Sequence, residues 1–231
     1  MTRLSFGSRR MEGPARQRGV CSRDRAFTLI EMLVVITIIS ILAGLSLAGV
    51  VYARRMAQER AVKADIQMLC ARIETFRNAF GYYPPSSLIR LKVKVNGIND
   101  ANESLFAYLQ SKKHGGPFAE DLKEDRWENA DGDSLTPPEM KIIASELDWI
   151  RGTNACLEHV DYYHSPFVYI PASDYGKKFK YQTIEGEFFE VEAAKNPTTG
   201  TYCAPTTFQL WSLGADGKNQ NGGGDDIVSW K

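Results

Sequence analysis

Three aspartates near the C-terminus carry the side chains best suited to bind a cation. Asp216, Asp225 and Asp226 flank the glycine-rich run 217–224. Calcium takes about six to eight oxygen ligands from carboxylates and backbone carbonyls, and glycines let carbonyls turn towards one point. A solvated acidic turn has the same composition. Composition alone favours that second interpretation.

A second acidic run, ENADGD at 128–133, resembles an EF-hand calcium loop. In an EF-hand the glycine occupies the sixth of about twelve positions. With Gly132 at that position, Trp127 would be the first ligand and Pro138 the last, and neither side chain suits calcium. We therefore do not expect an EF-hand here.

One carboxylate directly precedes a long apolar segment. The segment from Met32 to Val51 reads MLVVITIISILAGLSLAGVV, and Glu31 comes just before it. About 20 helical residues, at about 1.5 Å each, span the roughly 30 Å of a bilayer core. The run is too long for a signal peptide and lacks an A-x-A cleavage site, so it predicts a membrane-spanning helix. An ionised Glu31 would be costly there and needs a partner.

The charges that flank this segment indicate its orientation. Its N-terminal flank contains Arg3, Arg9, Arg10, Arg16, Arg18, Arg23 and Arg25 against only Glu12 and Asp24. By the positive-inside tendency, the basic flank stays cytoplasmic and the rest of the chain lies on the other side. Arg54 and Arg55 on the far flank weaken this assignment.

The helix is expected to continue beyond the membrane. Apolar residues recur at helical spacing at Val62, Ile66, Leu69, Ile73, Phe76 and Phe80. Gly81 and the pair Pro84-Pro85 then end the pattern, as a C-terminal cap and helix breakers do. One helix from about 27 to 80 is predicted, with Cys70 at the edge of its packed face.

Further elements predict an α+β fold. Residues 104–110 and 140–150 have helical patterns, whereas the polar run 119–138 reads as a surface loop. Strand patterns at 164–171, 187–191 and 207–212 form a small antiparallel set. The expected architecture is a long helix packed against a short antiparallel sheet.

No catalytic arrangement is found in the sequence. There is no GxSxG, Walker or HExxH motif, and no CxxC pair. The scattered histidines and cysteines do not have the spacing of a metal site; they are His114, His159, His164, Cys21, Cys70, Cys156 and Cys203. A net charge of +0 gives no reason to expect nucleic acid as a partner. We expect no enzymatic activity.

The segment Ala26-Phe27-Thr28-Leu29-Ile30-Glu31, followed by the apolar run, resembles the processing and methylation motif of type IV pilins and type II secretion pseudopilins. The resemblance implies that a prepilin peptidase cuts between Ala26 and Phe27 and that the new amino group of Phe27 is methylated. Glu31 would then attract the N-terminus of a neighbouring subunit. The family usually has glycine before the cut, where this chain has Ala26.

The C-terminal tail is similar to the calcium loop of the type II secretion major pseudopilin. It shares the run Ser-Leu-Gly-Ala-Asp-Gly at 212–217, the glycine-rich turn, the paired acids and a closing Trp230. The resemblance reverses the preference for a solvated turn. It implies a structural calcium ion bound by the carboxylates of Asp216, Asp225 and Asp226 and by the carbonyl of Leu213, with one further carbonyl from 221–223.

The resemblance also implies an organisation and a role. Residues 1–26 would be a cleaved leader, 27–53 the membrane and assembly half of the helix, and 54–231 a periplasmic domain. The chain would be a single-pass inner-membrane protein that polymerises into a pseudopilus. Its partners would be copies of itself, the prepilin peptidase, the inner-membrane secretion platform and minor pseudopilins. Because Cys156 and Cys203 would both be exported, a disulfide between them is predicted.

Two other interpretations stay open. The chain could be a type IV pilin or a minor pseudopilin. It could also be a membrane-anchored calcium-dependent binding protein, which would keep the anchor and the loop but would need neither Glu31 nor the cleavage site.

Overall fold

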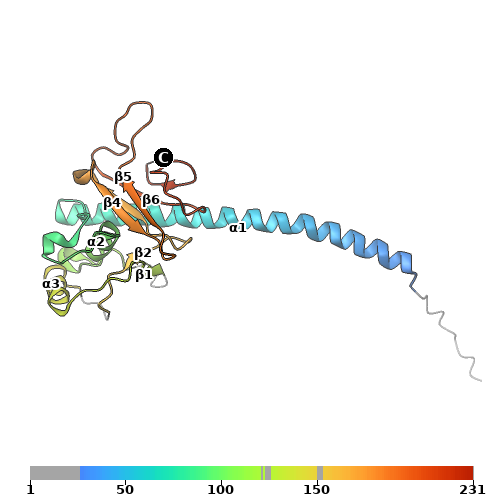
Figure 1. Cartoon of the computed structure of the whole chain (residues 1–231), viewed down its shortest axis with the longest axis horizontal. Coiled ribbons are helices and arrows are strands. Elements are labelled where there is room, and N and C mark those ends of the chain that lie inside the picture. Colours follow the sequence, from blue (N-terminus) through green and yellow to red (C-terminus); the bar gives the residue numbers. More distant parts are fainter. Residues whose placement is uncertain (1–26, 121, 123–125, 150–152, 231) are drawn as a thin grey trace, which may run out of the picture. The chain divides into compact units, whose positions relative to one another are not determined.

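A computed structural model describes residues 27–120, 122, 126–149 and 153–230. The predicted leader, including Ala26 and Cys21, lies outside these residues. The chain divides into two compact units between Gly49 and Val50. The elements shown in Figure 1 are the helices α1 (Leu29–Phe80), α2 (Asp100–Leu109) and α3 (Pro137–Leu147) and the strands β1 (Trp127–Glu128), β2 (Glu158–His159), β3 (Val168–Pro171), β4 (Lys178–Gln182), β5 (Phe188–Glu192), β6 (Phe208–Ser212) and β7 (Ile227–Val228).

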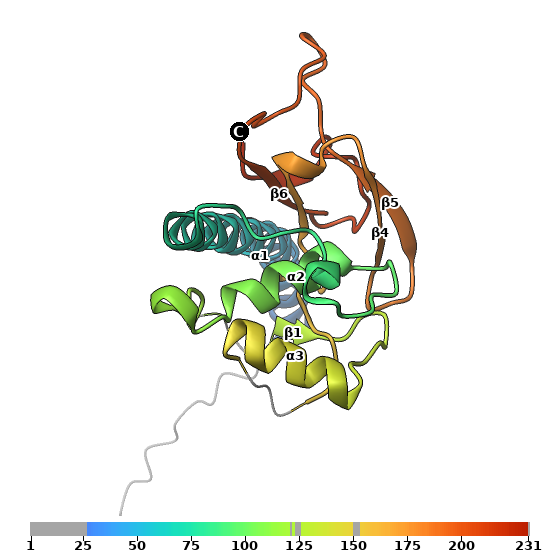
Figure 2. The ribbon, with the colours of Figure 1, turned by 90° about the vertical axis from the view of Figure 1, so that its left-hand side faces the viewer.

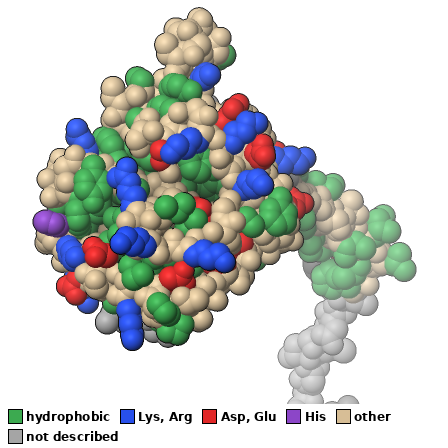
Figure 3. Space-filling model, turned by 60° about the vertical axis from the view of Figure 1, so that its left-hand side comes forward, with side chains coloured by type: hydrophobic (Ala, Val, Ile, Leu, Met, Phe, Trp, Pro, Cys, Tyr) green, Lys and Arg blue, Asp and Glu red, His purple; other side chains and the backbone are tan. Residues whose placement is uncertain are grey.

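The first part of α1 presents apolar side chains to its surroundings. All described side chains from Phe27 to Arg55 are exposed; Leu29 is 85% and Leu45 is 71% exposed. Figure 3 shows hydrophobic side chains covering this part of the helix. By length and composition, α1 could cross a membrane. Such exposure of large apolar residues calls for a lipid or protein environment around them.

The second part of α1 packs its predicted face into the core. Val62, Ile66, Leu69, Ile73 and Phe76 are all at most 3% exposed, which confirms the helical periodicity. The helix ends at Phe80. Gly81 follows with a φ of +80°, and its N–H donates to the carbonyl of Arg77 at 2.7 Å.

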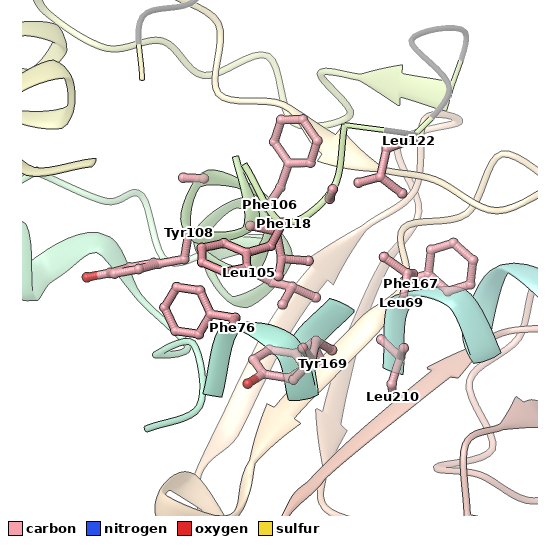
Figure 4. Packing of buried hydrophobic residues seen from close by; sticks show 14 of the residues in the cluster. Leu69, Phe76, Leu105, Phe106, Tyr108, Phe118, Leu122, Phe167, Tyr169 and Leu210 are labelled. Carbon is pink, nitrogen blue, oxygen red and sulfur yellow. The ribbon is translucent and has the colours of Figure 1, made fainter. Parts of the chain in front are cut away.

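Helix α2 is buried on all sides. Every residue from Ala101 to Leu109 is buried. Figure 2 shows α2 beside the second part of α1, with α3 on its other side. In the core shown in Figure 4, the ring of Phe76 meets Tyr108 and Phe118 edge to face, with centroids 5.9 and 5.4 Å apart. Helix α2 therefore packs directly on the second part of α1.

Buried polar groups fix α2 to the strands. The side-chain amide of Asn102 donates to the carbonyls of His159 and Phe167 at 3.0 and 2.7 Å, and its oxygen accepts the N–H of His159 at 2.8 Å. All polar atoms of Asn102 are thus used, which makes its complete burial favourable.

Within the described part of the chain, the strands form three small antiparallel sheets, of order β3-β6-β7, β4-β5 and β1-β2. The α+β class and the antiparallel pairing are confirmed. The prediction of one set was wrong in one respect, because β5 pairs with β4 rather than with β3 or β6. Strand β4 was not predicted; its two lysines are exposed, and Tyr181 is its buried residue.

The run 119–138 is more than a surface loop. Leu122 and Ala130 are buried, and β1 within the run pairs with β2. Helix α3 begins at Pro137, three residues before the predicted start, because Thr136 and Glu139 form a capping box. Two prolines stand at the first turn, where a missing N–H costs nothing.

An exposed loop joins β5 to β6. Residues 196–201 are exposed, and the loop is closed at its base by an antiparallel bridge between Lys195 and Tyr202. The N–H of Asn196 donates to the carbonyl of Thr201, and the N–H of Gly200 to that of Asn196, both at 2.8 Å.

Candidate functional site

The beginning of α1 forms a capping box around Glu31. One carboxylate oxygen, Oε2, accepts the backbone N–H and the hydroxyl of Thr28, both at 2.8 Å. In return, the N–H of Glu31 donates to the Thr28 hydroxyl oxygen at 3.2 Å. The box satisfies N–H groups that a helix start leaves unpaired. It also holds the carboxylate against Thr28, the residue that follows Phe27. Phe27 is the residue at which the mature chain is expected to begin.

Glu31 therefore has a local role in addition to the intermolecular one that the resemblance implies. A carboxylate in the first turn is favoured by the helix dipole as well as by these hydrogen bonds. Its side chain is exposed, so a cation from outside can still approach it. In a medium of low dielectric constant, an opposite charge within a few ångströms is attracted strongly.

The C-terminal loop brings the predicted aspartates into one hydrogen-bonded turn. Asp216 accepts the N–H of Lys218 at 2.8 Å and the side-chain amide of Gln220 at 3.1 Å. Asp225 accepts the N–H of Asp216 at 3.2 Å. Leu213 is fully buried at the loop's start. The loop is thus ordered by its own amides.

Gly214 allows the two ends of this loop to come together. Its φ is +71°, and a Cβ placed there would lie 2.4 Å from the carbonyl oxygen of Asp225. Since no side chain fits in that space, glycine is required at this position. At the other end of the loop, Trp230 packs edge to face on the buried Trp211, with centroids 5.8 Å apart.

Asp226 is the aspartate most suited to bind a cation. Its Oδ2 accepts the N–H groups of Gln220 and Gly222 at 3.1 and 2.7 Å, whereas its buried Oδ1 has no hydrogen-bond partner. Burial, with Asp225 and Asp216 nearby, raises the pKa of Asp226 to about 6. An adjoining cavity of about 590 Å³ is also lined by Arg55 and Lys63.

The comparison with known families supports the assignment of the N-terminal segment. The family model of the prokaryotic N-terminal methylation motif matches residues 21–47. The motif indicates the type IV pilin-like family. No curated protein and no solved structure matches the chain. The pilin-like assignment thus rests on the segment that contains Thr28 and Glu31.

The three predicted residues of the N-terminal motif are found in different surroundings. Phe27 is 71% exposed, Glu31 closes the capping box, and Ala26 lies outside the described residues.

The predicted disulfide is absent from the structure. Cys156 and Cys203 are both free. The Cys156 side chain is buried and contacts Asp133, whereas the backbone of Cys203 bonds to Ala194 and Gln209. The two residues are thus held against different parts of the fold. Export alone could not indicate this, because it says nothing about the distance between two cysteines.

The fold also brings together acidic residues that the sequence pattern did not indicate. Among the described residues, two groups of three potential metal ligands converge, and both contain Glu103. One group is completed by Asp131 and Glu158, the other by Asp133 and Cys156. Asp131 and Asp133 belong to the acidic run with the wrong EF-hand register. No local signal could have linked them to Glu103 and Glu158.

Proposed function

We propose that this chain is a major pseudopilin-like structural subunit of a type II secretion pseudopilus. It would polymerise through α1 and support protein export across the outer membrane. The observation that carries the proposal is the Glu31 carboxylate, held in the first turn of an exposed apolar helix within the matched methylation motif. A bare membrane anchor needs no charge at that position.

The chemistry of assembly would follow from these features. After cleavage before Phe27, the new amino group would carry a positive charge. The apolar side chains of α1 would pack against those of neighbouring subunits, and the N-terminus of one subunit would meet Glu31 of another. The attraction would compensate for the removal of both charges from water.

The capping box makes a sharp test of this role possible. Glu31→Gln retains an oxygen that can accept from Thr28, since glutamine also serves in capping boxes, but it removes the charge. Thr28→Ala removes both hydrogen bonds of the hydroxyl, leaves the backbone N–H bond to Glu31, and keeps the charge. We expect Glu31→Gln to be processed and inserted normally but to form few filaments, whereas Thr28→Ala should assemble more efficiently.

Filaments would be counted by electron microscopy in cells that express the prepilin peptidase and the secretion platform. Intact-mass measurement would verify that each chain begins at a methylated Phe27. Wild-type filament levels in Glu31→Gln would show that the charge is unnecessary. A mature chain that starts at Met1 would reject processing and assembly altogether.

We further propose that the C-terminal loop binds a structural calcium ion, as the resemblance to major pseudopilins implies. The unpartnered, buried Oδ1 of Asp226 supports this, because a cation would supply the missing partner. Asp216, Asp225 and the carbonyl of Leu213 would complete the ligand set when the loop exchanges some internal hydrogen bonds. The full chain, in detergent micelles, should unfold at a higher temperature in millimolar calcium than after calcium removal.

Other roles predict different outcomes. A type IV pilin would form filaments without secretion components, and a minor pseudopilin would form none without a major subunit. A membrane-anchored calcium-dependent binding protein would keep its function in Glu31→Gln. Deleting the gene and measuring protein export separates these roles, because only a pseudopilin is needed for secretion.

A further inference from the structure

A group of carboxyls converges at the start of α2, away from the C-terminal loop. Glu103 comes from α2, Glu158 from β2, and Asp131 from the turn after β1. One oxygen from each of these three residues lies within 4.8 Å of the others. Two oxygens on one calcium ion lie at most about 5 Å apart, since each bond measures about 2.3–2.6 Å. The three groups could therefore share an ion.

The turn that contains Asp131 is built to point its carboxylates inward. The side-chain oxygen of Asn129 accepts the N–H of Gly132 at 2.8 Å, and its amide donates to the carbonyl of Asp133 at 2.8 Å. Gly132 has a φ of +76°, a conformation that glycine adopts without strain. Asp133 is thereby placed near Glu103 and Cys156.

Two oxygens in this cluster have no hydrogen-bond partner. Glu103 is only 4% exposed, and its Oε1 is buried and unpaired. Oδ1 of Asp133 is buried and unpaired as well. Glu158 is completely buried, with one oxygen accepting from Asn99 at 3.0 Å and the other from the N–H of Ala130 at 2.9 Å. Buried oxygens without partners are rare and costly, so these two oxygens lack a positive or donating group.

The charges around Glu103 have the same sign. Burial raises its pKa well above the ordinary value, and Asp133, Glu158, Asp131 and Asp100 raise it further. Burial also raises the pKa of Glu158 to about 7. Without a cation, ionisation of these groups near neutral pH would be unfavourable.

We propose that Glu103, Asp131 and Glu158, assisted by Asp133, bind a calcium ion. The site would tie α2, the turn after β1 and strand β2 together. It is separate from the C-terminal loop and does not depend on the proposed pseudopilus role.

The ligand chemistry favours calcium over a softer metal. The carboxylates offer hard oxygens, which calcium prefers. Zinc would instead use the thiolate of Cys156. Cys156 offers one sulfur, whereas Glu103, Asp131, Asp133 and Glu158 offer carboxylate oxygens, so hard ligands predominate in the cluster.

The test uses the full chain in detergent micelles, stripped of metal, and titrates calcium by calorimetry. Asp226→Asn serves as the background, because it removes the most suited ligand of the C-terminal loop. Glu103→Gln and Asp131→Asn are introduced into this background. Glu120→Gln, which changes an exposed carboxylate close in sequence, is the matched control.

We expect the background protein and the Glu120→Gln control to bind one calcium ion and to gain roughly 5–10 °C in unfolding temperature at a hundredfold excess over Kd. Glu103→Gln and Asp131→Asn should each weaken binding at least tenfold. In metal-free buffer, Glu103→Gln should unfold at the same or a higher temperature than its background, because an amide replaces a repelled carboxyl.

Three results would overturn the proposal. The first is an Asp226→Asn protein that binds no calcium. The second is an unchanged calcium affinity in Asp131→Asn. This variant decides the question by itself if Glu103→Gln fails to fold. The third is stronger binding of zinc than of calcium that is lost in Cys156→Ser, which would make the site a thiolate site.

Discussion

Asparagine at position 226 should make the calcium-free protein more stable at neutral pH. Burial, with Asp225 and Asp216 nearby, raises the pKa of Asp226 from 3.8 to about 6. An acid whose pKa is raised on folding stabilises the fold fully below about pH 4, and this stability is lost as the pH rises to about 6. At about 1.36 kcal/mol per pH unit, the loss is about 3 kcal/mol. Solvent that reaches the adjoining cavity screens the charges and reduces it to on the order of 2 kcal/mol.

The substitution preserves the loop while it removes the titration. The asparagine oxygen can accept the N–H groups of Gln220 and Gly222 as Oδ2 of Asp226 does. Thermal unfolding of wild type and Asp226→Asn would be compared in calcium-free detergent solution at pH 7.5 and 4.5. For a unit of this size, the variant should unfold roughly 4–8 °C higher at pH 7.5. The difference should shrink to about a third at pH 4.5.

Calcium should reverse this order at pH 7.5, because only the wild type keeps the ligand. A variant that is less stable than wild type in calcium-free solution at pH 7.5 would refute the reasoning about burial. Equal stabilisation of both proteins by calcium, after Glu103→Gln has removed the second proposed site, would refute the loop as a calcium site.

Two further predictions concern packing. Leu69→Ala should lower the free energy of unfolding by about 2–5 kcal/mol, because the Leu69 side chain is only 2% exposed and its removal leaves a cavity in the core. Gln67→Ala, at an exposed position, should change the free energy of unfolding by less than about 0.5 kcal/mol. Denaturant titration of the full chain in micelles measures both. Gly214→Ala should abolish the calcium response of the loop through its clash with Asp225. Gly217→Ala is the control, because Gly217 also has a positive φ but an added Cβ there would meet no atom within 4 Å. If both variants lose the calcium response equally, backbone strain rather than the clash with Asp225 is the cause.

The sequence predicted what is encoded locally. The face of α1 from Val62 to Phe76 follows from a 3.6-residue period, and its end at Gly81 follows from turn chemistry. Strand β4 was missed although its residues Lys178–Gln182 alternate between polar and apolar, which is the pattern of a half-buried strand. The acidic cluster was missed because Glu103 and Glu158 lie far apart in the sequence and meet only where α2 packs on β2. The pairing of β1 with β2 then brings Asp131 to them.

The distinction between locally encoded contacts and contacts made at a distance applies to Glu31 as well. Its acidic type and its place in an apolar run indicated a partner, and the resemblance indicated a charged one. Threonine three residues before glutamate, as in Thr28 and Glu31, is the sequence signature of a capping box. The intramolecular partner was thus predictable from the residues, whereas an intermolecular partner depends on contacts between subunits.

The loop between β5 and β6 offers a place to label the protein. Because the bridge between Lys195 and Tyr202 closes its base, added residues at 197–199 would lengthen an existing loop rather than open a sheet. Doubling the length of a flexible loop costs only about 0.6 kcal/mol. A short epitope or a single reactive cysteine inserted there would leave α1, the C-terminal turn and the α2 carboxyls untouched. Such a tag would let antibodies or dyes report where each subunit stands in a filament and which surface it turns outward.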